Sequence, residues 1–131
     1  MATIFSRIAS GELPSYKVAS DDKHYAFLDI NPVRPGHVLV IPRKETDYLF
    51  DMDSEELGEL MKFVQKVAKG LKEAMPCKRV GVAVIGFDVP HAHIHLVPMD
   101  SNDDLNILGP KCKLPEAEMS HIAAAIAEKI K

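Results

Sequence analysis

Three histidines alternate with apolar residues in residues 91–97, and this pattern constrains the fold more than any other feature of the sequence. The stretch reads His91, Ala92, His93, Ile94, His95, Leu96 and Val97. Successive side chains of a β-strand point to opposite faces, whereas helical residues two apart lie roughly 200° apart around the axis. The alternation therefore predicts a strand whose histidines line one face while Ala92, Ile94 and Leu96 pack into a core.

Three interpretations of this histidine face are open. It could be an ordinary half-buried strand, although lysine, threonine or glutamate would serve a solvated face equally well. It could hold a metal, because neutral imidazole is a common zinc ligand and alternate strand positions bring histidines together. It could also carry out nucleophilic catalysis, with one imidazole attacking a substrate while its neighbours fix its tautomer and balance charge.

Three stretches of the sequence together resemble the histidine triad (HIT) family. Residues 91–97 match its His-φ-His-φ-His-φ-φ signature, in which φ is apolar. Residues 26–32 (Ala-Phe-Leu-Asp-Ile-Asn-Pro) and 35–42 (Pro-Gly-His-Val-Leu-Val-Ile-Pro) match a second part, and Ile4-Phe5 with residues 11–15 matches the opening. The matches run in order from residue 3 to residue 99. They are most similar to the nucleotide-binding branch related to the Hint proteins.

Hydrophobic spacing predicts the helices and strands of an α+β chain. A short helix is expected over residues 3–10, where Gly11 is a plausible stop, and a C-terminal helix over residues 115–131. The predicted strands are residues 16–20, 25–29, 37–41, 79–85 and 91–97. Residues 79–85 form a continuous apolar run, which is typical of a fully buried strand. These elements give an antiparallel sheet with helices on one face.

The longest predicted helix follows Asp53, which can cap it while Glu56 completes a capping box. Apolar residues keep helical spacing from residue 57 to residue 75. This run exceeds the length that one small sheet usually covers. The HIT resemblance implies a reason, because the corresponding helix helps to pair two subunits in that family.

The resemblance implies a HIT-like fold: a five-stranded antiparallel sheet with helices packed on one face, extended to ten strands across a homodimer. The chain of 131 residues is expected to be one such domain, residues 1–131. Its C-terminal loop and helix, residues 100–131, match no family motif.

The resemblance also implies the catalytic residues. His93, the middle histidine, matches the nucleophile that forms a covalent nucleotidyl-histidine, and His37 matches a fourth active-site histidine on the neighbouring strand. A neutral imidazole can attack phosphorus without a separate base, provided that a hydrogen bond at its second nitrogen fixes the tautomer. His91 and His95 lie on the same strand face, so they can supply such contacts or donate to the phosphate.

The nucleotide pocket follows from the same comparison. Asp29 and Ile30 match positions that hold the ribose, where a carboxylate can accept hydrogen bonds from both hydroxyls. Three further positions match apolar residues that sandwich a purine, although taken alone they are ordinary core positions. They are Phe5, Ile8 and Phe27.

Three parts of the sequence depart from the family pattern. The run before the triad, residues 84–89, is shorter than in relatives and places Asp88 where they carry an uncharged donor. A carboxylate beside a phosphate costs electrostatic energy unless it is protonated or turned away. Three roles for Asp88 are therefore open: it protonates an amine leaving group, it favours a cationic leaving group, or it only caps a turn. Many HIT proteins carry a Cys-x-x-Cys near the start of the chain that contributes to a zinc site. This sequence has Thr3 and Ser6 at those positions, so no zinc site is expected. Glu45, which replaces a histidine of many relatives, is expected to be peripheral.

The composition of the chain limits the kinds of molecule that it is expected to bind and the cellular compartment in which it is expected to lie. The formal net charge of −3 argues against a general nucleic-acid or anionic-membrane surface, and leaves room for one small phosphorylated ligand. Cys77 and Cys112 are far apart and lack a CxxC partner. Without a signal peptide or a long apolar run, both thiols are expected to be free in a reducing cytoplasm.

The leading hypothesis is a hydrolase or transferase that cleaves at the α-phosphate of a purine nucleotide or nucleoside phosphoramidate, without cofactor or metal. One alternative is a dinucleoside polyphosphate hydrolase. Another is a nucleotide-binding interaction protein in which hydrolysis is incidental, which the altered residues 84–89 would favour. A zinc protein is disfavoured, because no further acid or water-positioning group is spaced recognisably.

Overall fold

A computed structural model of the protein describes residues 2–130. Its helices are α1 (Ile4–Ala9), α2 (Ser54–Ala74) and α3 (Glu116–Lys129), with short 3-10 turns at η1 (Leu49–Asp51) and η2 (Asn102–Asp104). Its strands are β1 (Lys17–Ser20), β2 (His24–Leu28), β3 (Val38–Pro42), β4 (Arg79–Ala83) and β5 (Ile94–Met99). Every predicted helix and strand is present, with boundaries displaced by a few residues.

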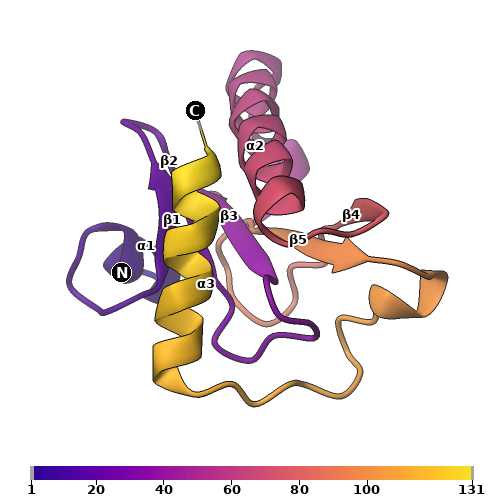
Figure 1. Cartoon of the computed structure of the whole chain (residues 1–131). Helices are drawn as coiled ribbons and strands as arrows, with labels where there is room; N and C mark the ends of the chain where they lie inside the picture. The colour runs from indigo at the N-terminus through magenta and orange to yellow at the C-terminus, as the bar shows by residue number, and fades with distance from the viewer. Residues whose placement is uncertain (1, 131) are drawn as a thin grey trace.

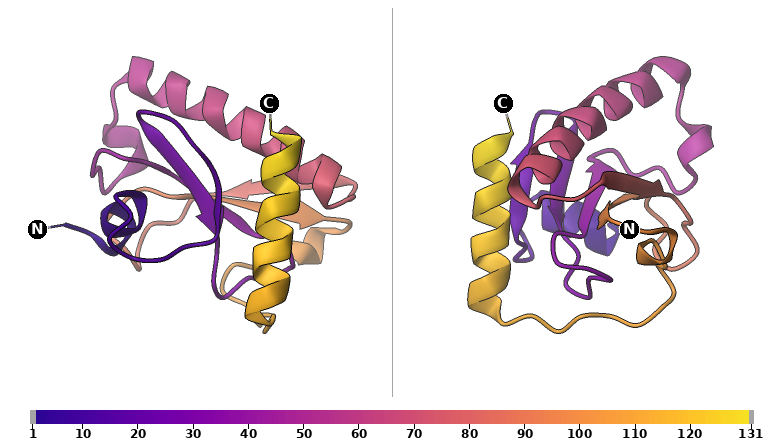
Figure 2. Two further views of the ribbon diagram at one scale, coloured as in Figure 1. Left: turned by 60° about the vertical axis from the view of Figure 1, so that its left-hand side comes forward. Right: turned by 45° about the vertical axis from the view of Figure 1, so that its right-hand side comes forward.

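The strands form one five-stranded antiparallel sheet in the order β1-β2-β3-β5-β4. The predicted α+β class and five-stranded antiparallel sheet are therefore confirmed. Figures 1 and 2 show the two long helices, α2 and α3, on one side of this sheet, while the six-residue α1 lies against the other side. The pairing of two such sheets in a dimer stays a prediction.

The main core fills the space between the sheet and the two long helices. Alternate residues of β2 and β3 point into it, among them Ala26, Leu28, Val38 and Val40. Helix α2 contributes its buried stripe, and α3 closes the core from the side. The buried members from these two helices are Leu60, Phe63, Val64, Val67, Leu71, Met119, Ile122, Ala123 and Ile126.

A second, smaller cluster lies on the opposite face of the sheet, under α1. Its members alternate with those of the main core along β2 and β3, because successive side chains of a strand change face. Phe5 is the buried residue of α1 and covers this cluster. The strand residues are Tyr25, Phe27, Leu39 and Ile41. This face carries the triad histidines, so α1 is the element that shelters them.

The N-cap predicted at the start of α2 is confirmed, whereas within residues 2–130 the Glu56 carboxylate does not complete the predicted capping box and instead lies 3.6 Å from the ammonium of Lys44. Asp53 is the N-cap, and its carboxylate accepts a hydrogen bond from the backbone N–H of Glu56 at 2.8 Å. The buried stripe of this helix includes Phe63. Its ring stacks on His24 of β2, with centroids 5.1 Å apart, and so ties the helix to the sheet.

The prediction that residues 79–85 form a fully buried strand is wrong. Within residues 2–130, β4 is an edge strand that pairs only with β5. Val82 is 51% exposed, and Val84 and Ile85, just beyond the strand, are also exposed. A continuous apolar run is therefore not by itself evidence of burial on both faces. Here it marks an apolar sheet edge.

The triad stretch is only partly within β5, which begins at Ile94. Continuing the β3–β5 register would place Ala92 opposite Pro42, and proline has no N–H for the ladder. The backbone N–H of Ala92 instead donates to the carbonyl of Thr46 at 2.7 Å. The predicted division of faces is confirmed, because Ala92, Ile94 and Leu96 all lie in the main core.

Within residues 2–130, no helix is both long enough and apolar enough to cross a membrane.

Candidate functional site

A pocket of about 630 Å³ opens between α1 and the histidine-bearing face of the sheet. All six residues predicted to bind substrate line it: Phe5, Ile8, Phe27, Asp29, Ile30 and Asp88. Of the histidines, His93 and His95 line it as well. His37 and His91 lie behind these two in the protein interior, with 1% and 0% exposure.

The tautomer of His93 is fixed by the backbone. Its Nδ1 lies 2.8 Å from the carbonyl oxygen of His91. A carbonyl only accepts, so Nδ1 carries the proton and donates it. The other ring nitrogen, Nε2, then holds a free lone pair, as a nucleophile toward phosphorus requires. Phe5 packs its ring edge-to-face with this imidazole, at a centroid distance of 5.0 Å.

A chain of hydrogen bonds fixes the tautomers of His37 and His95 in the same way. The backbone N–H of Val33 donates to Nδ1 of His37 at 3.2 Å, so the proton of His37 is on Nε2. That N–H in turn donates to Nδ1 of His95 at 2.9 Å. His95 therefore carries its proton on Nε2. It presents an N–H donor to the pocket beside the free lone pair of His93.

Both members of this histidine pair stay uncharged well below neutral pH. Burial lowers the pKa of His37 to about 4, and the charge of Lys111 adds to the effect. Burial also lowers the pKa of His95 to about 4, with further lowering from His37 and His93. A neutral pair preserves the one-proton-per-ring arrangement on which the hydrogen-bond chain depends.

His91 has both ring nitrogens occupied within the protein. Its Nε2–H donates to the carbonyl of Pro42 at 2.7 Å, and its Nδ1 accepts from the hydroxyl of Thr3 at 2.7 Å. Of the two roles expected for it, donation to phosphate and support of a neighbour, the geometry provides the second. The support comes from its backbone carbonyl, which holds His93.

Asp29 lies at the pocket wall next to the histidine pair. One carboxylate oxygen accepts from the backbone N–H of Asn31 at 2.8 Å, and the other lies 3.7 Å from Nε2 of His37. Burial raises the pKa of this carboxyl, while the Asn31 hydrogen bond opposes the rise. Ile30 beside it is 72% exposed at the pocket wall. Such a carboxylate is a suitable acceptor for hydroxyl groups of a ligand.

Two opposite charges stand in the pocket lining. Asp88 is exposed, and within residues 2–130 its side chain makes no hydrogen bond, so nothing in the described chain supports the turn-capping interpretation. Lys111 lies in the loop between η2 and α3, and its ammonium donates to the carbonyl of Ile107. Lys111 could not be identified from the sequence, because an isolated lysine in a loop has no periodicity or motif to distinguish it.

One group of residues has the composition of a metal site. Asp29, His37 and His95 bring one ligand atom each to within 4.8 Å of one another. A metal on Nε2 of His37 would need a lone pair there, but Nδ1 already uses its own to accept from Val33. Binding would require an imidazolate or the loss of the Val33 hydrogen bond. The hydrogen-bonded arrangement therefore does not suit a resident metal.

Thr3 and Ser6, at whose positions no zinc site is expected, belong to a hydrogen-bonded group. Thr3 and Ser6 both contact the carboxylate of Glu45, and Thr3 also contacts His91. The expectation that Glu45 is peripheral is therefore wrong, because it is joined to the triad through α1. A polar residue 42 positions away from its partner gives no local sequence signal for such a contact.

The geometry agrees with what the chain resembles in known proteins. A family model described as the HIT domain matches residues 10–102. An uncharacterized HIT-like protein of Borreliella burgdorferi is 34% identical over 97% of each chain, and an adenosine 5'-monophosphoramidase of Schizosaccharomyces pombe is 29% identical over the full length of both. The crystal structure of a Hit-like protein of Bartonella henselae, 34% identical, superposes with a TM-score of 0.83 over 97% of this chain and 95% of that one.

A family match covers most of the chain, and the relatives align over nearly the full length of both chains. These findings agree with the triad sequence, the five-stranded fold and the arrangement of histidines around the pocket. The chain belongs to the histidine triad (HIT) family.

Proposed function

We propose that the protein is a nucleotidyl hydrolase or transferase that cleaves nucleoside phosphoramidates at the α-phosphate through a covalent intermediate on His93. Family membership and the name of the fission-yeast relative, an adenosine 5'-monophosphoramidase, support a nucleotide hydrolase. The observation that carries the covalent mechanism is the tautomer of His93. Its proton is committed to the His91 carbonyl, which leaves the Nε2 lone pair for a ligand in the pocket.

The pocket supplies groups for each part of such a substrate. Phe5, Ile8 and Phe27 form an apolar wall for a base, and the carboxylate of Asp29 is placed to accept hydrogen bonds from ribose hydroxyls. His95 would direct its Nε2–H at the phosphate. A hydrogen-bond donor aimed at oxygens that gain charge lowers the barrier, because it is already oriented when the reaction begins.

The reaction takes place in two displacements. In the first, the Nε2 lone pair of His93 forms a bond to the α-phosphorus as the bond to the leaving amine breaks, and the amine takes a proton from solvent. In the second, water attacks phosphorus and the P–N bond to His93 breaks. The electron pair returns to Nε2, the water loses one proton, and a nucleoside monophosphate leaves.

Asp88 and Lys111 bear on the choice of leaving group. A carboxylate in the pocket lining attracts a cationic amine and repels further phosphates, which favours phosphoramidates. Lys111 acts in the opposite sense and favours the second candidate, a dinucleoside polyphosphate hydrolase. Turnover of adenosine phosphoramidate and of diadenosine polyphosphates by the purified protein would decide between them. Our proposal requires a higher kcat/KM for the phosphoramidate.

We also propose that the protein is a homodimer joined along β4. In the described part of one chain, residues 2–130, this strand has no partner on its outer edge, and its residue Val82 is half exposed. Exposed apolar sheet edges are usually covered, because their unpaired N–H and C=O groups readily add another strand. A second copy of β4 would extend the sheet to ten strands.

Replacement of His93 tests the mechanism. We expect His93→Ala to lower kcat by several powers of ten while nucleotide affinity changes by less than about tenfold, because the covalent bond contributes only to the reaction and not to binding. His91→Ala and His95→Ala should be slower than wild type but milder. His121→Ala, on the exposed side of α3, is the matched control and should behave as wild type.

Rapid quenching with substrate labelled at the α-phosphate gives an independent measurement. Label should appear on His93 within a single turnover, in an acid-labile phosphoramidate bond. Wild-type turnover by His93→Ala, or absence of protein-bound label under these conditions, would contradict the covalent mechanism. The interaction-protein alternative would then take precedence.

A further inference from the structure

We propose that Thr3, Ser6 and Glu45 form a positioning network that holds His91, and through it His93, in the tautomers needed for attack. The proposal rests on the function proposed above, because it assigns His93 the attacking role. None of the three residues lines the wall formed by His93 and His95. They act through His91, which lies behind the pocket in the protein interior.

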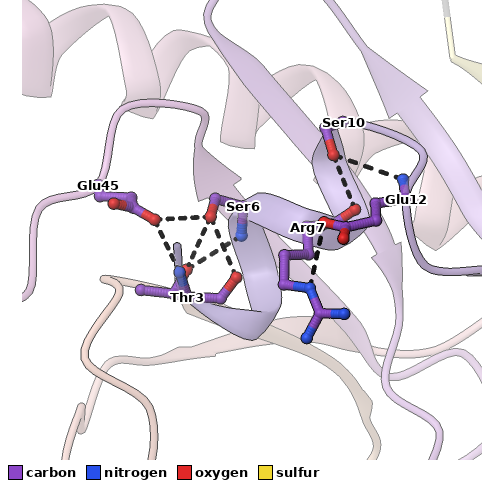
Figure 3. A network of polar contacts seen from close by, with 6 residues as sticks. All are labelled: Thr3, Ser6, Arg7, Ser10, Glu12 and Glu45. Atoms are coloured by element: carbon purple, nitrogen blue, oxygen red, sulfur yellow. Dashed lines mark hydrogen bonds and ion pairs between the residues drawn. The ribbon is translucent and has the colours of Figure 1, made fainter. Parts of the chain in front are cut away.

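The network begins at a carboxylate that receives two hydrogen bonds. One oxygen of Glu45 accepts from the backbone N–H of Thr3 at 2.7 Å and from the hydroxyl of Ser6 at 2.6 Å (Figure 3). These bonds, the Ser6 one foremost, lower the pKa of Glu45, so the carboxylate remains charged in neutral solution. Hydrogen bonds to an ionised acceptor are shorter and stronger than neutral ones. The first turn of α1 is thereby fixed to the loop after β3.

The second step runs from Thr3 to His91. The Thr3 hydroxyl accepts from the backbone N–H of Ser6 at 3.0 Å, as the N-cap of α1, and lies 2.7 Å from Nδ1 of His91. Since Nε2 of His91 must donate to the Pro42 carbonyl, Nδ1 is the acceptor. The single Thr3 hydroxyl proton is therefore directed at His91. The Pro42 carbonyl sets the neutral tautomer of this ring, and the Thr3 hydroxyl stabilises it by donating to the unprotonated Nδ1.

The third step joins His91 to the reacting ring. The carbonyl of His91 accepts a hydrogen bond from Nδ1–H of His93, and this bond keeps the Nε2 lone pair of His93 free. A shift of the His91 backbone would break the bond, and the proton of His93 would no longer be held on Nδ1. His91 is anchored through its ring at Thr3 and Pro42, and the next residue is anchored by its backbone at Thr46. Removing the Thr3 hydroxyl removes one of these three restraints.

A separate group of contacts at the other end of α1 provides a comparison. Arg7 pairs with Glu12 at 3.1 Å, and the Ser10 hydroxyl donates to the carbonyl of Arg7 at 3.0 Å (Figure 3). These contacts also stabilise the helix and the turn that follows it. They make no contact with a triad residue. Disturbing them tests whether fixing α1 alone is sufficient to explain an effect.

The experiment compares Thr3→Val and Glu45→Ala with the conservative Thr3→Ser and Glu45→Gln, and with Glu12→Gln as matched control. Outer-shell partners of metal-ligating imidazoles commonly contribute about 10- to 100-fold, and we expect Thr3→Val to lower kcat by a factor of the same order. KM should change by less than about twofold. Glu45→Ala should follow in the same direction, while Thr3→Ser, Glu45→Gln and Glu12→Gln should remain close to wild type.

The values of kcat and KM distinguish a positioning role from undocking of helix α1. Phe5 and Ile8 of α1 line the pocket, so undocking of the helix would raise KM and weaken nucleotide binding. A fall in kcat with KM unchanged therefore requires an altered triad behind an intact pocket. A rise in KM that accompanies the fall, or an equal fall in Glu12→Gln, would overturn the proposal in favour of simple helix anchoring.

Nitrogen NMR of the histidine rings gives a readout that needs no turnover, because protonated and unprotonated ring nitrogens resonate in separate regions. We expect wild-type protein to show His91 protonated on Nε2 and His93 on Nδ1, and Thr3→Val to show a mixture at one or both rings. Unchanged spectra in Thr3→Val would overturn the network. If instead His93→Ala retains turnover while the Thr3→Val spectra change, the proposed function fails and the network stands.

Discussion

The chemistry of the site depends on which nitrogen of each histidine carries its proton. His93 is protonated on Nδ1, whereas His37, His91 and His95 are protonated on Nε2, and in every ring a backbone group decides this, directly or through one neighbour. The spacing of the triad in the sequence predicts that the rings share a face. It contains no information on tautomers, because the deciding groups at Val33 and Pro42 come from other parts of the chain.

The histidine pair makes stability depend on pH in a defined direction. In the folded protein His37 and His95 titrate at about 4, below their ordinary 6.5, so the unfolded chain binds more protons between these values. The free energy of unfolding is therefore expected to fall as pH decreases from about 6.5 toward about 4. Each ring should contribute on the order of 1 kcal/mol between pH 7 and pH 5.

Urea unfolding at pH 7 and at pH 5 measures this dependence. His95→Gln lacks one of the two titrating rings and should show a smaller loss of stability over the same interval, whereas His121→Gln, on the exposed side of α3, should retain the wild-type loss. Asp29, whose carboxyl pKa is raised by burial from 3.8, acts in the opposite sense at the acid end. An equal pH dependence in His95→Gln and wild type would show that the pKa of His95 is not lowered in the folded protein.

At the scale of secondary structure, the features fixed by local chemistry were predicted and those fixed by topology were not. The cap at Asp53 and the stop at Gly11, which has φ of 88°, depend on neighbours in sequence and were predicted in place. The exposure of β4 depends on which strand lies beside it, so its apolar composition was misread. The start of β5 was placed too early, because the pairing limit is set by Pro42 of another strand.

Helix α2 offers a test of a predicted local contact. Asp53→Ala removes the acceptor of the Glu56 N–H and should lower the free energy of unfolding by about 1 kcal/mol. Activity of the remaining folded protein should be unchanged, because the cap lies outside the pocket lining. Asp22→Ala, at an exposed turn, is the control for loss of one carboxylate. Equal midpoints of urea unfolding for both variants and wild type would mean that the cap contributes nothing measurable.

For the whole molecule, the proposed dimer can be tested at the outer edge of β4. Val82→Glu places a charge where the second strand would pack, and a buried unpaired charge is costly. Sedimentation at micromolar concentration should give about twice the chain mass for wild type and one chain mass for this variant. Lys17→Glu places the same residue on β1, the opposite edge strand, and should stay dimeric. Wild-type protein that sediments as a monomer would exclude the arrangement.

The pocket as a whole could be predicted only where the resemblance supplied positions. Composition and spacing identified the histidine face, but Phe5, Ile8 and Phe27 looked like ordinary core residues, as their burial in part justifies. The place of Lys111 in the pocket and the contact of Glu45 with Thr3 were not predicted, because each residue approaches the site from a loop. Only the folded chain brings such residues to the histidines.

The hydrogen bond between Thr3 and His91 joins residues that are 88 positions apart. Bringing the ends of such a long segment together costs chain entropy, so this contact has little reason to form before the strands between its ends have paired. Thr3 and the helix that it caps would then be among the last parts of the chain to reach their native place. During folding, the sheet would exist for a time with its histidines uncovered, and closure of the first helix would be the event that converts a folded scaffold into a competent site.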